Sequence, residues 1–571
     1  MASDEYTRYT ETLDALGHTP WTTVLQGAGK RVVPSREHEC SQARCDLCFD
    51  RFCDFRDDMR APCGRTKADA EALLLLRRML TAAGTAQRGA LQTIQAILRS
   101  PQSIEDTAVA DLLSRLQPLT TDGSQESTLS TQRLLRHLLH GILGGYTQAE
   151  GRSLWARVLA DPESLKRLDK TGMVPKPAYT QLIDAAALLS PGSLQDRDEI
   201  QRAATTTALS AFFDGLAAQA FLTELLKFKT QKNTSTPVGL ANLRPQTLNL
   251  VLLTDNAVQA ARLIETSWKA SEILENANAE QIAFFVAGDN GARVAAKLGI
   301  PWLADYNAEV LLPFATLVDG IIVGSGNHPP MVATAAQVAE VPLLRLGVPA
   351  SCDGFFEATV THFSRRVRSN TPALSGKGNF VLLRDYLRRI EGRPRIAARR
   401  ATVDAMQQGT LRGIALVYAG QLDAGQPEEI ETLLRTLHTQ GLLPIVAGAV
   451  ALPAALAGWT DEHEATALLP FRRSFEDATG VLLPPVIVAG GAAELAATYL
   501  LLQRERLVRT DPLTLPIRFF LPTQFDPVGE LMAISLAALG CEVTVAQQPD
   551  WQIRLFETGT GEPAQMEKGS T

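Results

Sequence analysis

The hydrophobic pattern of this chain changes near Pro237. Before it, from about residue 67 to 240, apolar residues recur at helical spacing, while Pro and Gly are sparse and β-branched runs are few. Such a pattern predicts one helix after another. We expect these helices at Ala68–Ala83, Thr131–Leu143, Tyr179–Leu189 and Ile200–Phe228. Gly84 predicts the end of the first helix, because glycine is common just beyond the last helical residue.

After Pro237, short apolar runs alternate with short helical stretches. The first series predicts strands at Leu248–Leu253, Gln281–Ala287 and Gly320–Val323, with helices at Gly291–Leu298 and Met331–Val338. A second series predicts strands at Ile414–Tyr418, Leu443–Val446, Val486–Val488 and Ile517–Leu521. Continuous apolar strands between helices are typical of parallel sheets that are covered on both faces.

The order of these patterns predicts an α/β protein, in which an N-terminal helical domain with a cysteine-rich loop is followed by two Rossmann-like parallel α/β domains. The polar stretch Arg365–Lys377 contains Pro and Gly and is a candidate boundary. The predicted parts are residues 1–66 with the cysteine loop, 67–240 as the helical domain, 241–375 as the first α/β domain and 376–571 as the second.

Composition narrows the class of protein. The chain has 571 residues, 45% hydrophobic and 20% charged, which is an ordinary globular balance. Its formal net charge of −7 argues against a nucleic-acid-binding surface. No apolar run reaches the roughly 18 residues that a membrane span needs. The acidic start Met1–Tyr6 lacks a signal-peptide pattern. We therefore expect a cytoplasmic protein without a membrane span and without a nucleic-acid partner.

The cysteines are unevenly distributed. Five of the seven lie within 24 residues, whereas Cys352 and Cys541 stand alone. The five are Cys40, Cys45, Cys48, Cys53 and Cys63. Thiolates this dense on one loop suit a [4Fe–4S] cluster, for which Cys45, Cys48, Cys53 and Cys63 are the candidate ligands and Cys40 is a possible extra one. Zinc is the alternative, because four thiolates also suit tetrahedral Zn²⁺.

The segment from Cys40 to Gly64, and on to Gly84, resembles the N-terminal cluster region of nickel–iron carbon monoxide dehydrogenases. Hybrid-cluster (prismane) proteins are more distant members of the same superfamily. The resemblance continues at Pro237–Leu240, Leu298–Asn307 and Leu317–Val323, and fades toward Gly540. It implies the helical, α/β, α/β order predicted above, a buried [4Fe–4S] cluster and a dimer formed near that cluster.

The ligands of the family's catalytic nickel–iron–sulfur cluster are not found in this chain. The resemblance implies one histidine and five cysteines at strand ends. These six positions fall at Asp255, near Asp289 and Asn327, and near Gly420, Gly448 and Ala492. No cysteine lies between Cys352 and Cys541, and a cluster of soft metal sites needs thiolates. We therefore expect no nickel.

The family's acid–base residues are missing as well. Residues 522–540, which correspond to the family's catalytic lysine segment, contain no Lys, Arg or His. Residues 83–90, on the helix that carries the family's proton path, contain no histidine. Whether this chain is an enzyme stays open, but carbon monoxide oxidation by the family mechanism is not expected.

Polar residues follow three predicted strands and would gather at the carboxyl ends of the first sheet, where α/β proteins bind ligands. They are Asp255, Asn256, Asp289, Asn290, Asn327 and His328. Two interpretations remain open: a pocket for a polar small molecule or a hard metal ion, and a vestigial cleft filled with water.

Two functions therefore remain. In the first, the chain is a carbon monoxide dehydrogenase-like pseudoenzyme, an electron-transfer or scaffold subunit. In the second, it is a redox enzyme of altered chemistry that acts on a small molecule in the strand-end pocket between the two α/β domains. We expect a homodimer, or a hetero-oligomer with a redox partner protein. A cluster shared between two copies is not expected, because Arg44 occupies one of the two bridging cysteine positions and leaves only Cys40.

Overall fold

The structure is a computed structural model of residues 1–571. It describes residues 8, 11–12, 44–45, 53–54, 66–99, 139–140, 142–147, 151–190, 196–225, 235–254, 257–267, 279–288, 291–305, 308–324, 328–346, 352–368, 374–390, 393–422, 426–461, 466–507, 516–522 and 526–545. Cys40, Cys48, Cys63 and five of the six predicted pocket residues lie outside these ranges.

The chain divides into two compact units. Unit 1 comprises residues 1–33, 228–495 and 511–517, and unit 2 comprises residues 34–227, 496–510 and 518–571. Both units draw on segments that are far apart in the sequence. The four predicted domain ranges stay predictions.

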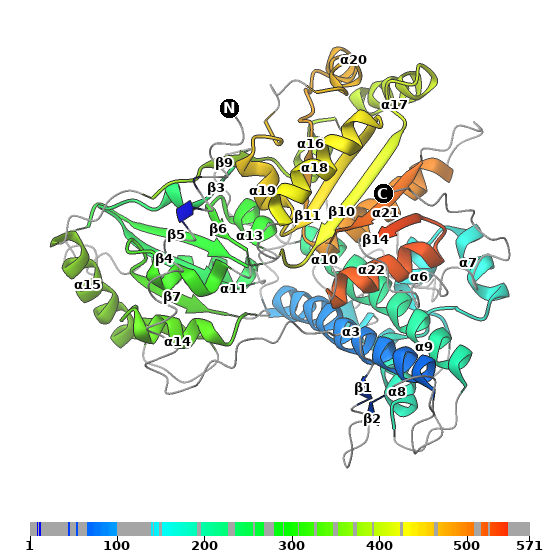
Figure 1. Ribbon diagram of the computed structural model, residues 1–571, viewed down its shortest axis with the longest axis horizontal. Coiled ribbons are helices and arrows are strands. Elements are labelled where there is room, and N and C mark those ends of the chain that lie inside the picture. Colours follow the sequence, from blue (N-terminus) through cyan, green and yellow to red (C-terminus); the bar gives the residue numbers. More distant parts are fainter. Residues whose placement is uncertain are drawn as a thin grey trace, which may run out of the picture. The chain divides into compact units, whose positions relative to one another are not determined.

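The N-terminal half of unit 2 is helical, as predicted. Its described helices are α3 (Lys67–Arg99), α6 (Leu154–Leu159), α7 (Pro162–Lys170), α8 (Ala178–Leu188), α9 (Arg197–Ser210), the π-helix η4 (Ala211–Ala217) and α10 (Ala218–Glu224). Most of the predicted helix Thr131–Leu143 lies outside the described residues. Figure 1 shows α3 lengthwise beside α9. The predicted end at Gly84 is wrong, because α3 continues through that residue. Residues on both sides of it, such as Ala83 and Ala86, are buried, and this packing outweighs the cost of about 1 kcal/mol for one helical glycine.

The π-helix η4 holds a buried carboxylate, Asp214. The Ser153 hydroxyl donates to Asp214 Oδ1 at 2.5 Å. The backbone N–H groups of Trp155 and Ala178, at the starts of α6 and α8, also donate to this carboxylate. One side chain thus caps two helices. Burial raises the pKa of Asp214 to about 7, although these three hydrogen bonds oppose the rise.

Unit 2 also contains short strands and a C-terminal helix. β1 (Arg44–Cys45) and β2 (Cys53–Asp54) pair antiparallel. Residues 518–521 of β13 (Ile517–Leu521) pair in parallel with β14 (Glu542–Val545). The helix that connects β13 to β14 along the chain, α22 (Pro527–Ala538), packs against α3 and α9.

The first α/β series of unit 1 forms a sheet of seven strands in the order β8-β7-β4-β5-β6-β3-β9. The strands are β3 (Thr236–Val238), β4 (Leu248–Leu253), β5 (Ile282–Ala287), β6 (Trp302–Ala304), β7 (Gly320–Val323), β8 (Leu343–Arg345) and β9 (Gly378–Phe380). All neighbours are parallel except β9, which runs antiparallel to β3. Every residue of β4 is buried, as its mostly apolar run predicts, and its one polar residue, Asn249, donates to the carbonyl oxygen of Leu317.

Helices and helical turns connect these strands (Figure 1). They are η5 (Leu240–Asn242), α11 (Ala257–Ser267), α13 (Gly291–Leu298), η6 (Ala308–Phe314), α14 (Met331–Val338) and α15 (Cys352–Arg368). The bounds of β4, β7, α13 and α14 are those predicted from the sequence. The predicted α/β fold is confirmed.

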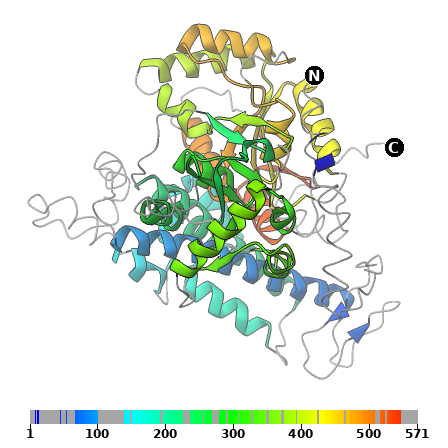
Figure 2. The ribbon, with the colours of Figure 1, turned by 90° about the vertical axis from the view of Figure 1, so that its left-hand side faces the viewer.

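The second α/β series places β12 (Ile487–Gly490), β11 (Leu442–Gly448) and β10 (Gly413–Ala419) side by side and parallel. Its helices are α16 (Leu383–Arg389), α17 (Arg393–Gln407), α18 (Gln426–Thr439), α19 (Ala451–Leu456), α20 (Leu469–Thr479) and α21 (Ala492–Leu507). Figure 2 shows α17 and α20 next to each other at the top of the view.

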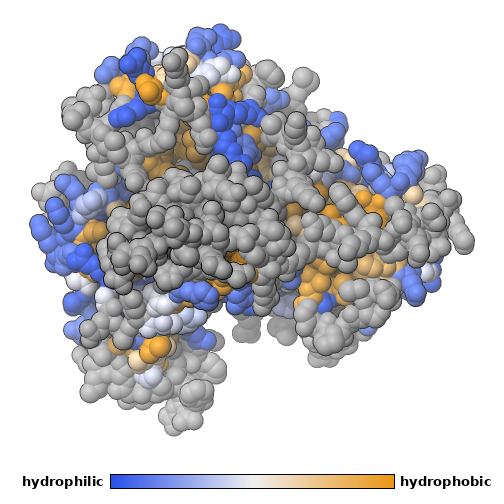
Figure 3. Space-filling view, turned by 180° about the vertical axis from the view of Figure 1, so that it is seen from behind, coloured by the Kyte–Doolittle hydropathy of each residue, from blue (hydrophilic) through white to orange (hydrophobic). Residues whose placement is uncertain are grey.

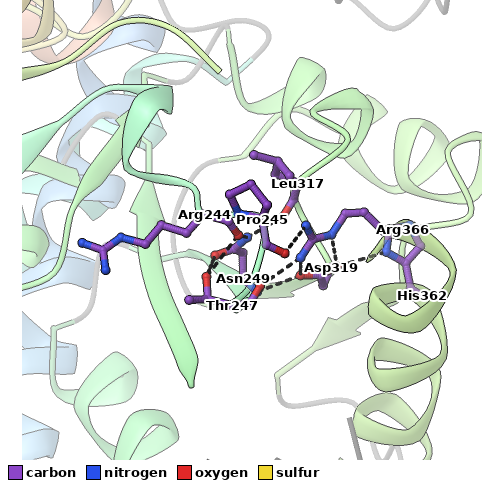
Figure 4. A network of polar contacts seen from close by, with 8 residues as sticks. All are labelled: Arg244, Pro245, Thr247, Asn249, Leu317, Asp319, His362 and Arg366. Atoms are coloured by element: carbon purple, nitrogen blue, oxygen red, sulfur yellow. Dashed lines mark hydrogen bonds and ion pairs between the residues drawn. The ribbon is translucent and has the colours of Figure 1, made fainter. Parts of the chain in front are cut away.

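A buried ion pair joins the amino end of the first sheet to α15 (Figure 4). Arg366 donates from Nε to Asp319 Oδ1 at 2.8 Å and from Nη2 to Asp319 Oδ2 at 2.9 Å. Its Nη1 and Nη2 also donate to the carbonyl oxygens of Pro245 and Thr247. Asp319 in turn accepts the backbone N–H of Asn249 at 2.8 Å. Residues 365–368 of the predicted boundary stretch are thus the last turn of α15, and one of them is part of the core.

No helix in the described part of the chain is long and apolar enough to cross a membrane.

Candidate functional site

The structure describes two cysteines of the predicted cluster loop, Cys45 and Cys53. Cys45 lies on β1 and Cys53 on β2, and the two residues are partners in the antiparallel register. Their backbones therefore lie directly opposite each other. This pairing fits a loop that gathers its thiolates at one metal site, with a donor set that suits either a [4Fe–4S] cluster or zinc. Among the described residues, no group of three or more His, Cys, Asp or Glu could hold a metal ion.

Three strands of the first sheet end side by side. Leu253, Ala287 and Val323 are the last residues of β4, β5 and β7, and Leu253 is the register partner of the other two. The predicted pocket residues directly follow these ends. Asp255, Asn256, Asp289, Asn290 and Asn327 lie outside the described residues, whereas His328 is described.

His328 forms a buried pair with Glu309. Its Nδ1 lies 3.0 Å from Glu309 Oε2 and 3.2 Å from Oε1. The His328 side chain is 8% exposed and the Glu309 side chain is fully buried. A carboxylate held against one ring nitrogen fixes the orientation of the imidazole, and with it the direction of the second nitrogen.

Gly288 allows this carboxylate to approach the end of β5. Its φ is +117°, and a Cβ added there would lie 2.7 Å from Glu309 Oε1. Any other residue would be strained by that φ and would also collide with the carboxylate. Glu309 was not among the residues predicted from the sequence, where it is a lone carboxylate in the apolar run of η6. That isolation is the only signal in the sequence that could have identified it.

A second buried ion pair links the two α/β series within unit 1. Arg293 Nη1 on α13 lies 3.5 Å from Glu494 Oε1 on α21, and their side chains are 3% and 12% exposed. Glu494 Oε2 also accepts the backbone N–H of Gly491 at 3.0 Å. Both helices start directly after a strand, β5 and β12 respectively. The backbone N–H of Gly491, at the start of α21, could otherwise hold a phosphate, but it donates to the chain's own Glu494 carboxylate.

The other strand ends in unit 1 also lack thiols. Gly420 directly follows β10, Gly448 ends β11, and Ala492 opens α21 just beyond β12. These are the positions near which the resemblance would require cysteines. The buried Cys541 lies elsewhere, in unit 2, where it directly precedes β14 at the amino end of that strand. In the described part of unit 1, the residues at the strand ends provide oxygen, nitrogen and backbone groups but no sulfur.

Residues 522–540 contain a buried carboxyl group, although they have no Lys, Arg or His. Glu530 on α22 is 5% exposed, and its Oε2 lies 3.1 Å from Arg78 Nε on α3. Burial raises the pKa of Glu530 to about 7, while Arg78 lowers it and Asp526 raises it further. Glu530 was not among the residues predicted from the sequence, where the absence of cationic side chains was the feature of this segment.

The comparisons with known proteins support the fold. No family model matches the chain, and the search of curated proteins finds no significant match. Solved structures do match. An acetyl-CoA synthase/carbon monoxide dehydrogenase structure with NiZn[Fe4S4] and NiNi[Fe4S4] clusters has a TM-score of 0.81 at 16% identity and covers 94% of this chain and 87% of that chain.

Two carbon monoxide dehydrogenases are similar to the same degree. Carbon monoxide dehydrogenase IV from Carboxydothermus hydrogenoformans has a TM-score of 0.78 at 17% identity, and covers 92% of this chain and 90% of its own. A nickel-free carbon monoxide dehydrogenase from Thermococcus sp. AM4 has a TM-score of 0.79 at 15% identity, with 94% of both chains covered. The chain therefore has the carbon monoxide dehydrogenase fold over most of its length.

Proposed function

We propose that this protein is a carbon monoxide dehydrogenase-like iron–sulfur protein that lacks the nickel catalytic cluster and acts as an electron-transfer or scaffold subunit. The distribution of cysteines carries the proposal. Five of the seven lie between residues 40 and 63, and only Cys352 and Cys541 remain for the rest of the chain. Two thiolates cannot replace the five that the fold's nickel cluster needs.

The candidate ligands of the retained cluster are Cys45, Cys48, Cys53 and Cys63. The cross-strand register of Cys45 and Cys53 supports one site for these residues. A bound [4Fe–4S] cluster would supply one-electron transfer. The chain itself would contribute the thiolates and the charge around them. Arg44, Arg51, Arg56 and Arg60 flank these cysteines and would offset the negative charge of the thiolates.

The test is the metal content of the protein purified without oxygen. We expect about four irons and four sulfides per chain, a reducible absorption band near about 400 nm, and no nickel. Cys48→Ser and Cys53→Ser should each abolish the band, whereas Cys352→Ser is the matched control and should keep it. Stoichiometric zinc without sulfide would make the loop structural and end the electron-transfer proposal. Nickel would show that the cluster has ligands other than those considered.

The buried His328–Glu309 pair favours a second candidate, a redox enzyme that binds a small molecule at the strand ends. An imidazole oriented by a carboxylate is suited to bind a polar ligand or to move a proton. Under this candidate His328→Gln abolishes turnover or ligand binding but leaves the metal content unchanged. Under the first candidate neither cluster reduction nor partner binding responds to that change.

A further inference from the structure

One stretch of this acidic chain is strongly basic. Residues 384–400 contain seven arginines but only two carboxylates, Asp385 and Glu391, although the net charge of the chain is −7. The arginines are Arg384, Arg388, Arg389, Arg393, Arg395, Arg399 and Arg400. They fall on α16 and α17 in unit 1.

The structure places four of these arginines at the surface. Arg388 and Arg389 are exposed on α16, and Arg399 and Arg400 are exposed on α17. The Arg389 guanidinium lies 5.3 Å from the ring centroid of Tyr386, a residue that is 1% exposed. Stacking on a buried ring restrains this arginine, so less side-chain entropy is lost when it binds an anion.

A groove runs between α17 and α20, and one of these arginines, Arg400, lines it. It has a volume of about 400 Å³, and its lining includes Ala397, Ala401 and Ala478, with Arg400 and Asp404 beside them. Ile396, which also lines it, is 61% exposed. Figure 3 shows this end of the molecule, at the top of the view, as mostly hydrophilic with small hydrophobic areas. Small side chains in the lining leave room for an apolar side chain from outside.

We propose that α16, α17 and the groove beside α20 dock an acidic partner protein. Carboxylates of the partner pair with the exposed Arg399 and Arg400, and one of its apolar side chains packs against Ile396 in the groove. Arginine together with exposed apolar residues is the composition of a protein–protein interface. Leu387, 42% exposed on α16, adds to the apolar part of the surface. This proposal does not depend on the metal content of the cysteine loop.

The same observations argue against nucleic acid and anionic membranes. Asp404 lies in the groove lining next to Arg400 and would repel a phosphate chain that follows the groove, whereas only an apolar side chain of the proposed partner enters it. The net charge of −7 repels an extended polyanion, whereas a small acidic surface contacts only the basic patch. Local charge complementarity therefore favours an acidic protein.

The test measures binding of the full chain to a labelled helical peptide with glutamates on one face and leucines on the other, by fluorescence anisotropy. We expect saturable binding that weakens between about 50 and 300 mM salt. The Arg399→Glu/Arg400→Glu variant should bind at least about tenfold more weakly, and Ile396→Ser a few-fold more weakly. Arg244→Glu is the control, because this exposed arginine precedes β4 and is not part of α16, α17 or the groove lining.

Three results would overturn the proposal. One is the absence of saturable peptide binding. The second is equal or tighter binding of single-stranded DNA or phosphatidylglycerol vesicles that is lost in the Arg399→Glu/Arg400→Glu variant. The third is an equal loss of peptide binding in the single variants Arg244→Glu and Arg400→Glu, which change the charge equally, and this would mean that net charge alone determines the affinity. Circular dichroism of every variant separates loss of binding from loss of fold.

Discussion

Arg366 and its neighbour Arg365 have opposite environments. Arg366 is 5% exposed and pairs with the fully buried Asp319. Arg365 is 69% exposed and lies 3.6 Å from Glu340, which is 78% exposed. Removing one partner of a buried ion pair leaves the other charge buried without compensation and destabilises the fold. A surface ion pair contributes little to stability. One residue type at adjacent positions therefore has very different effects on stability.

We expect Arg366→Leu to lower the free energy of unfolding by about 3–5 kcal/mol, because Asp319 would be buried without its partner. Arg365→Leu should change it by less than about 1 kcal/mol. Urea unfolding followed by circular dichroism measures both. Equal losses in the two variants would contradict the role assigned to the buried pair.

Glu530 predicts a dependence of stability on pH. Its pKa is raised from 4.5 to about 7 in the folded protein, so the folded state holds the proton more tightly than the unfolded state. Its contribution to stability is complete below about pH 4.5 and is lost as the pH rises through 7. Glu530→Gln cannot ionise and should escape this loss, on the order of 1–3 kcal/mol at pH 8.

The measurement for Glu530→Gln is urea unfolding of the variant and the wild type at pH 5 and pH 8. The exposed Glu163, changed to Gln, is the control and should follow the wild type at both pH values. A stability difference between Glu530→Gln and the wild type that is the same at both pH values would contradict the raised pKa.

At the scale of elements, two glycines in unit 2 have different roles. Gly84 lies within α3, and a Cβ added there would meet no atom within 4 Å. Gly215 lies in η4, and its added Cβ would be 2.7 Å from Ala86 Cβ on α3. The first glycine is only a weak point in the helix, whereas the second allows two helices to pack closely.

Gly84→Ala should therefore stabilise the protein by about 0.5–1 kcal/mol, which is the helix propensity gained. Gly215→Ala should destabilise it by about 1–3 kcal/mol, because the added methyl group forces the helices apart. Thermal unfolding of the two variants side by side tests the pair. A gain in stability with Gly215→Ala would show that η4 and α3 separate easily.

The sequence predicted elements better than contacts. Apolar runs set the bounds of β4 and β7, because a strand buried on both faces is mostly apolar, and the buried exception in β4, Asn249, is hydrogen-bonded. The end predicted at Gly84 was wrong, since the packing of α3 determines where that helix stops. The roles of Glu309 and Arg366 in buried ion pairs could not be predicted from the sequence, because their partners are 19 and 47 residues away. Of the predicted pocket, the described residues include only His328, which is buried at the expected strand end.

At the scale of the whole molecule, the fold is shared with carbon monoxide dehydrogenases at only 15–17% identity. A core of apolar strands tolerates such divergence as long as volume and pattern are kept. A metal site does not tolerate such divergence, because the metal binds only ligand atoms of suitable chemistry. The fold can therefore persist in a chain that has five of its seven cysteines in one loop.

The number of available cysteines limits how two copies of the chain can associate. Two copies of Cys40 supply two thiolates, too few for a four-thiolate cluster between subunits. We expect a homodimer of twice 61.7 kDa by light scattering under anaerobic conditions, with the same mass in Cys40→Ser. Cys45→Ser, which removes a proposed ligand of the local cluster, is the comparison. Conversion of Cys40→Ser alone to a monomer would show that Cys40 bridges two subunits.

The π-helix η4 has a consequence for aligning this chain with others. A π turn closes its hydrogen bond from residue i to residue i+5, so it contains one residue more than an α turn. The helix from Arg197 to Glu224 is therefore longer by one residue than a regular helix that spans the same distance. Against a chain whose helix is regular, a correct alignment opens a one-residue gap between Ala211 and Ala217. An alignment that forbids gaps inside helices would shift every position of α10 by one and would match its buried face to the wrong residues.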